Sequence, residues 1–166
     1  MKNKRILSFF LTIVLLFSLL MPQAYAASDI LSGMKVKAKA ALLVNLDTDT
    51  VLYQQDADKK IYPASITKVM TAMLAIEAVD RGELSLNDVI TVGSEVNREV
   101  GDGSSTQNIK EGEQIRLEDV LYCALTASAN EACNVLAQAV SGSVDDFVAL
   151  MNQRAGELGM EDTHFS

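Results

Sequence analysis

The stretch 65–79 constrains the fold of this 166-residue chain more than any other segment. Apolar residues would lie on nearly every side of a helix built from it, at positions 66, 69, 70, 72–76, 78 and 79. A helix that is apolar nearly all round is buried inside a domain rather than laid on its surface. Pro63 favours a helix start just before this stretch, and Arg81-Gly82 favours an end just after it. We therefore expect a core helix against which other elements pack.

The flanking segments predict an α+β fold. Residues 38–45 and 50–55 are β-prone and enclose a polar, turn-like stretch at 46–49, which is the pattern of a β-hairpin. Mostly helical patterns follow the core helix. The remaining predicted elements are a short helix running into an extended piece at 84–92, loops with short strands at 93–114, helices at 117–127 and 131–140, and a last helix from the cap Ser143 to Gly159.

The first 26 residues are typical of a secretory signal peptide. Lys2, Lys4 and Arg5 precede an apolar run at 6–21, and Ala24-Tyr25-Ala26 has the small-x-small pattern of a cleavage site. An uncleaved membrane anchor is the alternative, but a spanning helix wants about 20 apolar residues. We predict an exported protein whose mature chain, 27–166, is part of one domain.

Composition argues against several classes of function. The formal net charge of −8 disfavours binding to nucleic acid, which depends on Lys and Arg neutralising phosphates. The single histidine, His164, has no partner at a spacing typical of metal ligands. We predict neither a metal nor a cofactor. Cys123 and Cys133 lie in apolar helical sequence and are expected to be buried free thiols, although export also permits a disulfide.

Ser65 and Lys68 form a candidate nucleophile and base. A serine hydroxyl is a poor nucleophile until a base takes its proton, and no Ser-His-Asp set is convincing here. In a helix, residues i and i+3 lie on one face, so the Lys68 amine could reach the Ser65 oxygen. A lysine serves as a base only when desolvation lowers its pKa, and the apolar neighbours of Lys68 could provide that environment. The backbone N–H of Ser65 is a possible oxyanion donor.

A second motif, Ser128-Ala129-Asn130, lies at a predicted break between two helices. There a hydroxyl could pass a proton to the leaving group, and an amide could hold both the lysine and the substrate backbone. Each motif alone is weak, because Ser32-Gly33-Met34-Lys35 and Ser85-Leu86-Asn87 repeat the same spacings elsewhere in the chain. Their order, with about 60 residues between them in a hairpin-then-helices chain, is a much stronger signal.

These motifs resemble those of the D-alanyl-D-alanine carboxypeptidases, the low-molecular-mass penicillin-binding proteins. The likeness extends from about residue 38 to residue 166. The segments that carry it are 62–71, around Ser65; 110–113; 125–132, around Ser128; and 157–165. The resemblance implies a β-lactamase/transpeptidase-like fold and an enzyme that removes the terminal D-alanine from the peptidoglycan stem pentapeptide through an acyl-enzyme on Ser65. It also implies that β-lactams acylate the same serine.

By position, the resemblance assigns Ser65 as nucleophile, Lys68 as base, and Ser128 and Asn130 to the second motif, with Asn130 binding substrate. Ala129 replaces a glycine that many relatives have. The family's third motif, Lys-Thr-Gly on a strand beside the nucleophile, does not occur before Ser166. Losing one oxyanion donor of such a strand costs about 10² to 10³ in rate. We therefore expect a truncated fold that lacks the later sheet strands, is impaired in activity, and could associate with membrane only through a C-terminal segment beyond residue 166.

Two alternatives stay open. A serine β-lactamase shares both motifs and the fold, but it needs a deacylating carboxylate on a later loop. A non-catalytic, wall-binding fragment is the other. The expected location is the extracellular face of the cytoplasmic membrane or the cell wall.

Overall fold

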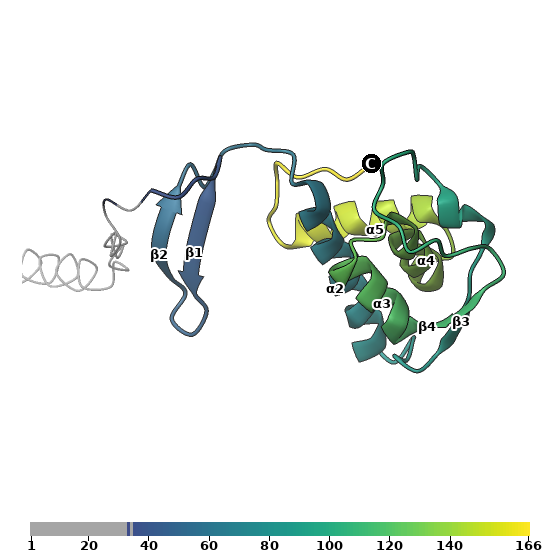
Figure 1. The fold of residues 1–166 in the computed structure, drawn as a ribbon. Helices are drawn as coiled ribbons and strands as arrows, with labels where there is room; N and C mark the ends of the chain where they lie inside the picture. Colours follow the sequence, from purple (N-terminus) through teal and green to yellow (C-terminus); the bar gives the residue numbers. More distant parts are fainter. Residues whose placement is uncertain (1–32, 34) are drawn as a thin grey trace, which may run out of the picture. The chain divides into compact units, whose positions relative to one another are not determined.

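Two compact units make up the chain, Met1–Lys59 and Lys60–Ser166 (Figure 1). The computed structural model describes residue 33 and residues 35–166. The predicted signal peptide at 1–26 lies outside the described residues, so it stays a prediction. Among the helices that are described, none has the length and apolar character needed to cross a bilayer.

The first unit contains the predicted β-hairpin. Strand β1 (Ala41–Asn45) pairs antiparallel with β2 (Thr50–Gln55), with Asn45 opposite Thr50 and an irregularity between Leu43 and Val44. The side chain of Asn45 organises the turn, because its Oδ1 accepts hydrogen bonds from the backbone amides of Asp47 and Thr48. The hairpin prediction is confirmed, with β1 beginning at Ala41 rather than at residue 38.

The second unit combines helices with a small antiparallel sheet, so the α+β prediction is confirmed. Its elements are η1 (Ala64–Ile66), α2 (Thr67–Asp80), β3 (Val89–Thr91), η2 (Ser94–Asn97), β4 (Gln114–Arg116), α3 (Leu117–Thr126), α4 (Asn130–Ser141) and α5 (Val144–Glu157). Strands β3 and β4 pair with Ile90 opposite Ile115. The helices predicted after residue 116 are confirmed. The 3₁₀ turn η2 was not predicted.

The short helix predicted at the start of 84–92 is wrong, because a tight turn precedes β3. The Ser85 amide donates to Oδ2 of Asp88 at 2.7 Å, and the Asn87 amide donates to the Ser85 hydroxyl at 3.2 Å. Such side chain–backbone bonds offer the chain an alternative to helix. The other copy of the Ser-x-Asn spacing, at Ser85, is therefore part of a turn.

Helix α4 is the centre of the second unit, where it packs against α2, α3, α5 and η2 (Figure 1). Leu136 and Val135 of α4 meet Leu117 and Val120 of α3 in one buried cluster. On the other side Ala137 joins a second cluster of α2 and α5 side chains, namely Met70, Leu74, Phe147, Met151 and Ala155. Gly142 ends α4 at a φ of 82°, and Ser143 caps α5 by accepting a 3.1 Å hydrogen bond from the Asp146 amide.

The prediction that the helix of 65–79 is buried all round holds for one side only. Leu74, Ala75 and Ala78 are almost completely buried against the other helices. Ile66 and Val69, by contrast, are 68% and 61% exposed. Helix α2 therefore joins the core along one face, and its first turn stays accessible to solvent.

Candidate active site

Ser65 lies on a 3₁₀ turn rather than on the α-helix that the sequence predicted. Pro63 begins this turn, and the Ile66 amide donates to the Pro63 carbonyl at 3.2 Å. Ala64 has a φ of 50°, a left-handed conformation that is uncommon outside glycine. Helix α2 follows at Thr67, which puts Lys68 in its first turn. The nucleophile candidate is thus exposed, while Lys68 is half-buried one turn further on.

The second motif meets Ser65 through Ser128. The Ser128 hydroxyl donates to the Ser65 Oγ at 3.0 Å across 63 residues of sequence. Ser128 sits in the connection between α3 and α4 with a φ of 56°, another left-handed residue that is not glycine. Strained backbone of this kind persists only where the surroundings hold it, and it clusters at functional sites.

Lys68 meets the same motif through Asn130. Its Nζ donates to the Asn130 Oδ1 at 2.7 Å, and Asn130 is the first residue of α4. Ala129 between the two motif residues is completely buried, and its amide donates to the Cys123 carbonyl at 3.1 Å. A small side chain is therefore required at this middle position. The structure thus brings all four predicted site residues together, in two hydrogen-bonded pairs.

The half-buried thiol of Cys133 lies one turn beyond the motif. Its Sγ is 3.6 Å from the Ala129 carbonyl oxygen, to which it donates. Burial raises the pKa of this thiol to about 11, although the positive charge of Lys68 opposes the shift. Cys123 is also half-buried and free, so both thiols are unpaired in the structure, as expected, but neither is fully buried. Among the described residues, no group of three or more His, Cys, Asp or Glu side chains could hold a metal ion.

Sequence reasoning missed the residue that follows Asn130. Glu131 is only 1% exposed, and its Oε1 accepts hydrogen bonds from the Thr106 hydroxyl and the Gln107 amide, both at 2.5 Å. Just before it, the Asn130 amide donates to the Ser105 carbonyl at 2.9 Å. The one signal in the sequence was a carboxylate that is followed directly by Ala132 and Cys133 in a predicted helix.

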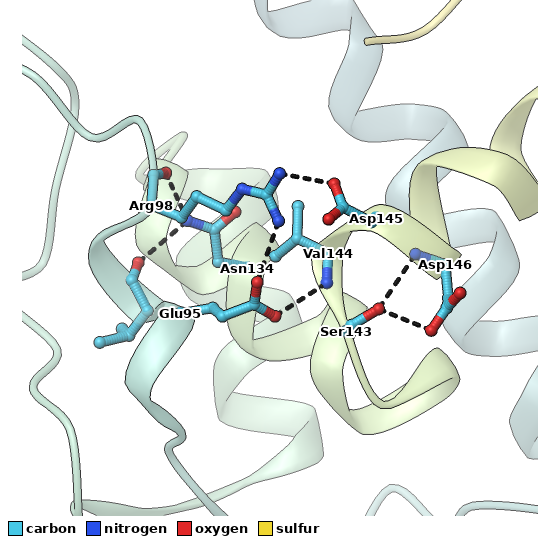
Figure 2. A network of polar contacts seen from close by, with 8 residues as sticks. Glu95, Arg98, Asn134, Ser143, Val144, Asp145 and Asp146 are labelled. Atoms are coloured by element: carbon cyan, nitrogen blue, oxygen red, sulfur yellow. Dashed lines mark hydrogen bonds and ion pairs between the residues drawn. The ribbon is translucent and has the colours of Figure 1, made fainter.

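A second set of contacts holds the segment around η2 to α4 and α5 (Figure 2). The Asn134 side-chain amide donates to the carbonyls of Val96 and Arg98, at 3.0 and 2.9 Å. Arg98 pairs with Glu95 and with Asp145, and Glu95 accepts from the Val144 amide at 3.0 Å. Helix α4 therefore holds the connection between β3 and β4 at two places, near Asn130 and near Asn134.

Comparison with known proteins agrees with this arrangement. A family model described as D-alanyl-D-alanine carboxypeptidase matches residues 24–166. The chain is 34% identical over 164 residues to D-alanyl-D-alanine carboxypeptidase DacF of Bacillus subtilis, covering 98% of this chain and 41% of that protein. It thus spans about two fifths of that relative's length.

Two solved structures share the fold. The D-alanyl-D-alanine carboxypeptidase DacD from Francisella tularensis superposes with a TM-score of 0.74 at 27% identity, over 80% of this chain and 32% of that one. Penicillin-binding protein D2 from Listeria monocytogenes, in its ampicillin-bound form, gives 0.62 at 33% identity, over 76% and 48%. The described residues therefore form part of the penicillin-binding, transpeptidase-like fold, as predicted. The chain belongs to the D-alanyl-D-alanine carboxypeptidase family.

Proposed function

We propose that this protein is a serine-type D-Ala-D-Ala carboxypeptidase that trims the peptidoglycan stem pentapeptide. The observation that carries the proposal is the meeting of two distant motifs, through the 3.0 Å contact of Ser128 with Ser65 and the 2.7 Å contact of Lys68 with Asn130. Chance repeats of the same spacings would not converge in this way. The family match supports the same reaction.

In the proposed reaction, the Lys68 amine takes the proton of the Ser65 hydroxyl. The Ser65 Oγ then attacks the carbonyl carbon of the penultimate D-alanine, forming an ester as the C–N bond to the last D-alanine breaks. Ser128, whose hydroxyl donates to the Ser65 Oγ, gives a proton to the departing amine and receives in return the proton that Lys68 took from Ser65. Water then hydrolyses the ester and frees Ser65. Asn130 holds the lysine and also contacts the substrate backbone.

β-Lactams would enter the same path and remain on Ser65 as a stable ester. The ampicillin-bound form of the Listeria relative supports a β-lactam site in this fold.

We also propose that residues 1–26 direct export and are removed after Ala26, because the proposed substrate lies outside the cytoplasm. Mass spectrometry of the protein from its producing cells would then give Ala27 as the first residue. Retention of residues 1–26 would instead indicate an anchor.

A fluorescent penicillin tests the nucleophile directly, in protein expressed from its complete reading frame. We expect covalent label on the wild type and none on Ser65→Ala. The matched control is Ser32→Ala, which removes the serine of the other Ser-x-x-Lys spacing and should label like the wild type. Label on Ser65→Ala would contradict the assignment.

Two further measurements define the reaction. We expect a peptide ending in D-Ala-D-Ala to release free D-alanine, and the penicillin label to persist for minutes after excess reagent is removed. Turnover of the label within seconds would instead identify a β-lactamase. Absence of both labelling and D-alanine release from the wild type would indicate a non-catalytic protein.

A further inference from the structure

Glu131 is a charged side chain with almost no access to solvent. It is 1% exposed, in the first turn of α4 and directly after Asn130. Burying a carboxylate is costly unless hydrogen bonds and nearby dipoles compensate. The amino end of a helix supplies part of that compensation, because its unpaired N–H groups favour negative charge. The rest must come from the groups that the carboxylate contacts.

Thr106 and Gln107, in the segment 105–108, make two such contacts. The Thr106 hydroxyl and the Gln107 amide both donate to Oε1 of Glu131 at 2.5 Å, and the Asn108 amide donates to the same Thr106 hydroxyl at 2.9 Å. The other carboxylate oxygen, Oε2, is buried and has no hydrogen-bond partner among the described residues. One oxygen of Glu131 therefore ties this segment to α4.

The carboxylate is ionised at neutral pH. Desolvation raises the pKa of Glu131, but the hydrogen bonds from Thr106 and from nearby backbone amides outweigh it and hold the pKa below its ordinary value. Hydrogen bonds to an ionised acceptor are roughly twice as strong as those between neutral groups. The attachment of segment 105–108 is accordingly strong.

This attachment acts on the neighbouring residue, Asn130. The Asn130 backbone amide donates to the Ser105 carbonyl at 2.9 Å, while its side chain accepts from Lys68 at 2.7 Å. Ser105 is the residue before Thr106, so the Glu131 contact and the Ser105 contact form one continuous attachment. Releasing Thr106 and Gln107 would free the Ser105 carbonyl, and the first turn of α4 would lose the support that aims Asn130 at Lys68.

We propose that Glu131 is a positioning residue for the acylation of Ser65, acting through segment 105–108 and Asn130. This role rests on the proposed function. Asn134, one turn further along α4, offers a comparison within the same helix (Figure 2). Its side chain donates to the carbonyls of Val96 and Arg98, which lie outside segment 105–108. The Asn134 side chain therefore holds a different part of the chain from the one that Glu131 holds.

The test compares Glu131→Ala, Glu131→Gln and Asn134→Ala in protein expressed from its complete reading frame. Each is measured for urea unfolding, for amide hydrogen exchange, and for penicillin acylation with the covalent rate constant separated from the dissociation constant. For Glu131→Ala we expect faster exchange at Gln107 and Asn108 and a covalent step slowed about tenfold or more, because small misplacements of catalytic groups are that costly. For Asn134→Ala we expect faster exchange near Val96 and a covalent step within about threefold of the wild type.

Glu131→Gln should restore most of the rate, because its amide oxygen can still accept from Thr106 and Gln107. Should Glu131→Ala fail to fold, Thr106→Val removes one of the two donors at an exposed position and should slow the covalent step by an intermediate factor. The proposal is overturned if Glu131→Ala, or Thr106→Val where Glu131→Ala does not fold, acylates at the wild-type rate. It is equally overturned if Asn134→Ala slows acylation as much as Glu131→Ala does. A wild type that is never acylated would refute the proposed function itself, and the positioning role with it.

Discussion

Lys68 and Asn130 are joined by a 2.7 Å hydrogen bond from Nζ to Oδ1, across 62 residues of sequence. Asn130 begins α4, and Lys68 lies in the first turn of α2. The neutral amide oxygen orients the amine without adding a negative charge next to it. This distinction matters for a group proposed to accept a proton, because a carboxylate at the same place would favour the charged ammonium form.

Asn130→Asp should therefore lower activity strongly while preserving the fold. An acidic residue in the first turn of a helix is favourable by about 0.3–1 kcal/mol, so the free energy of unfolding should be unchanged or slightly higher. The new carboxylate holds Lys68 as an ammonium ion, which cannot take the Ser65 proton, and we expect penicillin acylation to fall by about 10² or more. Urea unfolding and acylation kinetics measure the two effects.

Asn134→Asp is the matched control for that substitution, one turn later on the same helix. The Asn134 Nδ2 donates to two carbonyls, and an aspartate has no donor to replace it. Stability should fall by about 1–3 kcal/mol, since buried carbonyls lose their partner. Acylation by the folded protein should remain. Loss of activity in both variants, or in neither, would contradict the role given to Asn130.

Ser128 combines a chemical role with a strained backbone, and two substitutions separate them. Both Ser128→Ala and Ser128→Gly remove the hydroxyl that donates to Ser65, so both should lower acylation to a similar extent. At a φ of 56° a side chain is strained by roughly 1 kcal/mol, which glycine avoids. The glycine variant should therefore be at least as stable as the alanine variant, despite its greater freedom in the unfolded chain. A clearly less stable glycine variant would contradict this account.

The local sequence pattern was sufficient for the elements that depend on local contacts. Helix α5 follows from its apolar period and from Ser143, whose hydroxyl binds the Asp146 amide three residues on. The turn before β3 was misread as helix because Ser85 and Asp88 suit both a helix start and a turn, and only the side-chain contacts decide between them. The 3₁₀ turn at Ser65 escaped prediction for a similar reason, since it depends on the left-handed conformation of Ala64.

Contacts between distant segments were predictable only where both segments carry motifs of one known family. Ser65 and Ser128 were expected to meet because their two motifs occur together in one family. Glu131 has its partners at Thr106 and Gln107, and no spacing or period relates those positions. The exposure of Ile66, at the end of η1, and of Val69, in α2, was not predicted either, because an all-apolar helix does not reveal on which side its partners lie.

Cys133 should report on the charge of Lys68. With a thiol pKa of about 11, only about one Cys133 in a thousand is a thiolate at pH 8, so alkylation should be slow and should rise steeply as the pH approaches 11. The positive charge of Lys68 lowers this pKa, hence Lys68→Met should raise it further and slow alkylation wherever the lysine carries its charge. Measurements in a Cys123→Ser background isolate the one thiol. Equal alkylation rates with and without Lys68 would show that the two groups do not interact.

Gly93 is required by space rather than by backbone conformation, since its φ is −86°. A Cβ built at this position would lie 2.5 Å from Nε2 and 2.9 Å from Oε1 of Gln138 on α4. Gly93→Ala should therefore push aside the flexible end of the Gln138 side chain, so the cost should lie at the low end of the about 1–3 kcal/mol that overpacking takes. In a Gln138→Ala background the clash is absent, so the same Gly93→Ala change should cost much less. A double-mutant cycle measured by urea unfolding should give a coupling energy of about 0.5–3 kcal/mol. If Gly93→Ala destabilises both backgrounds equally, the close approach of η2 to α4 is not what excludes a side chain at residue 93.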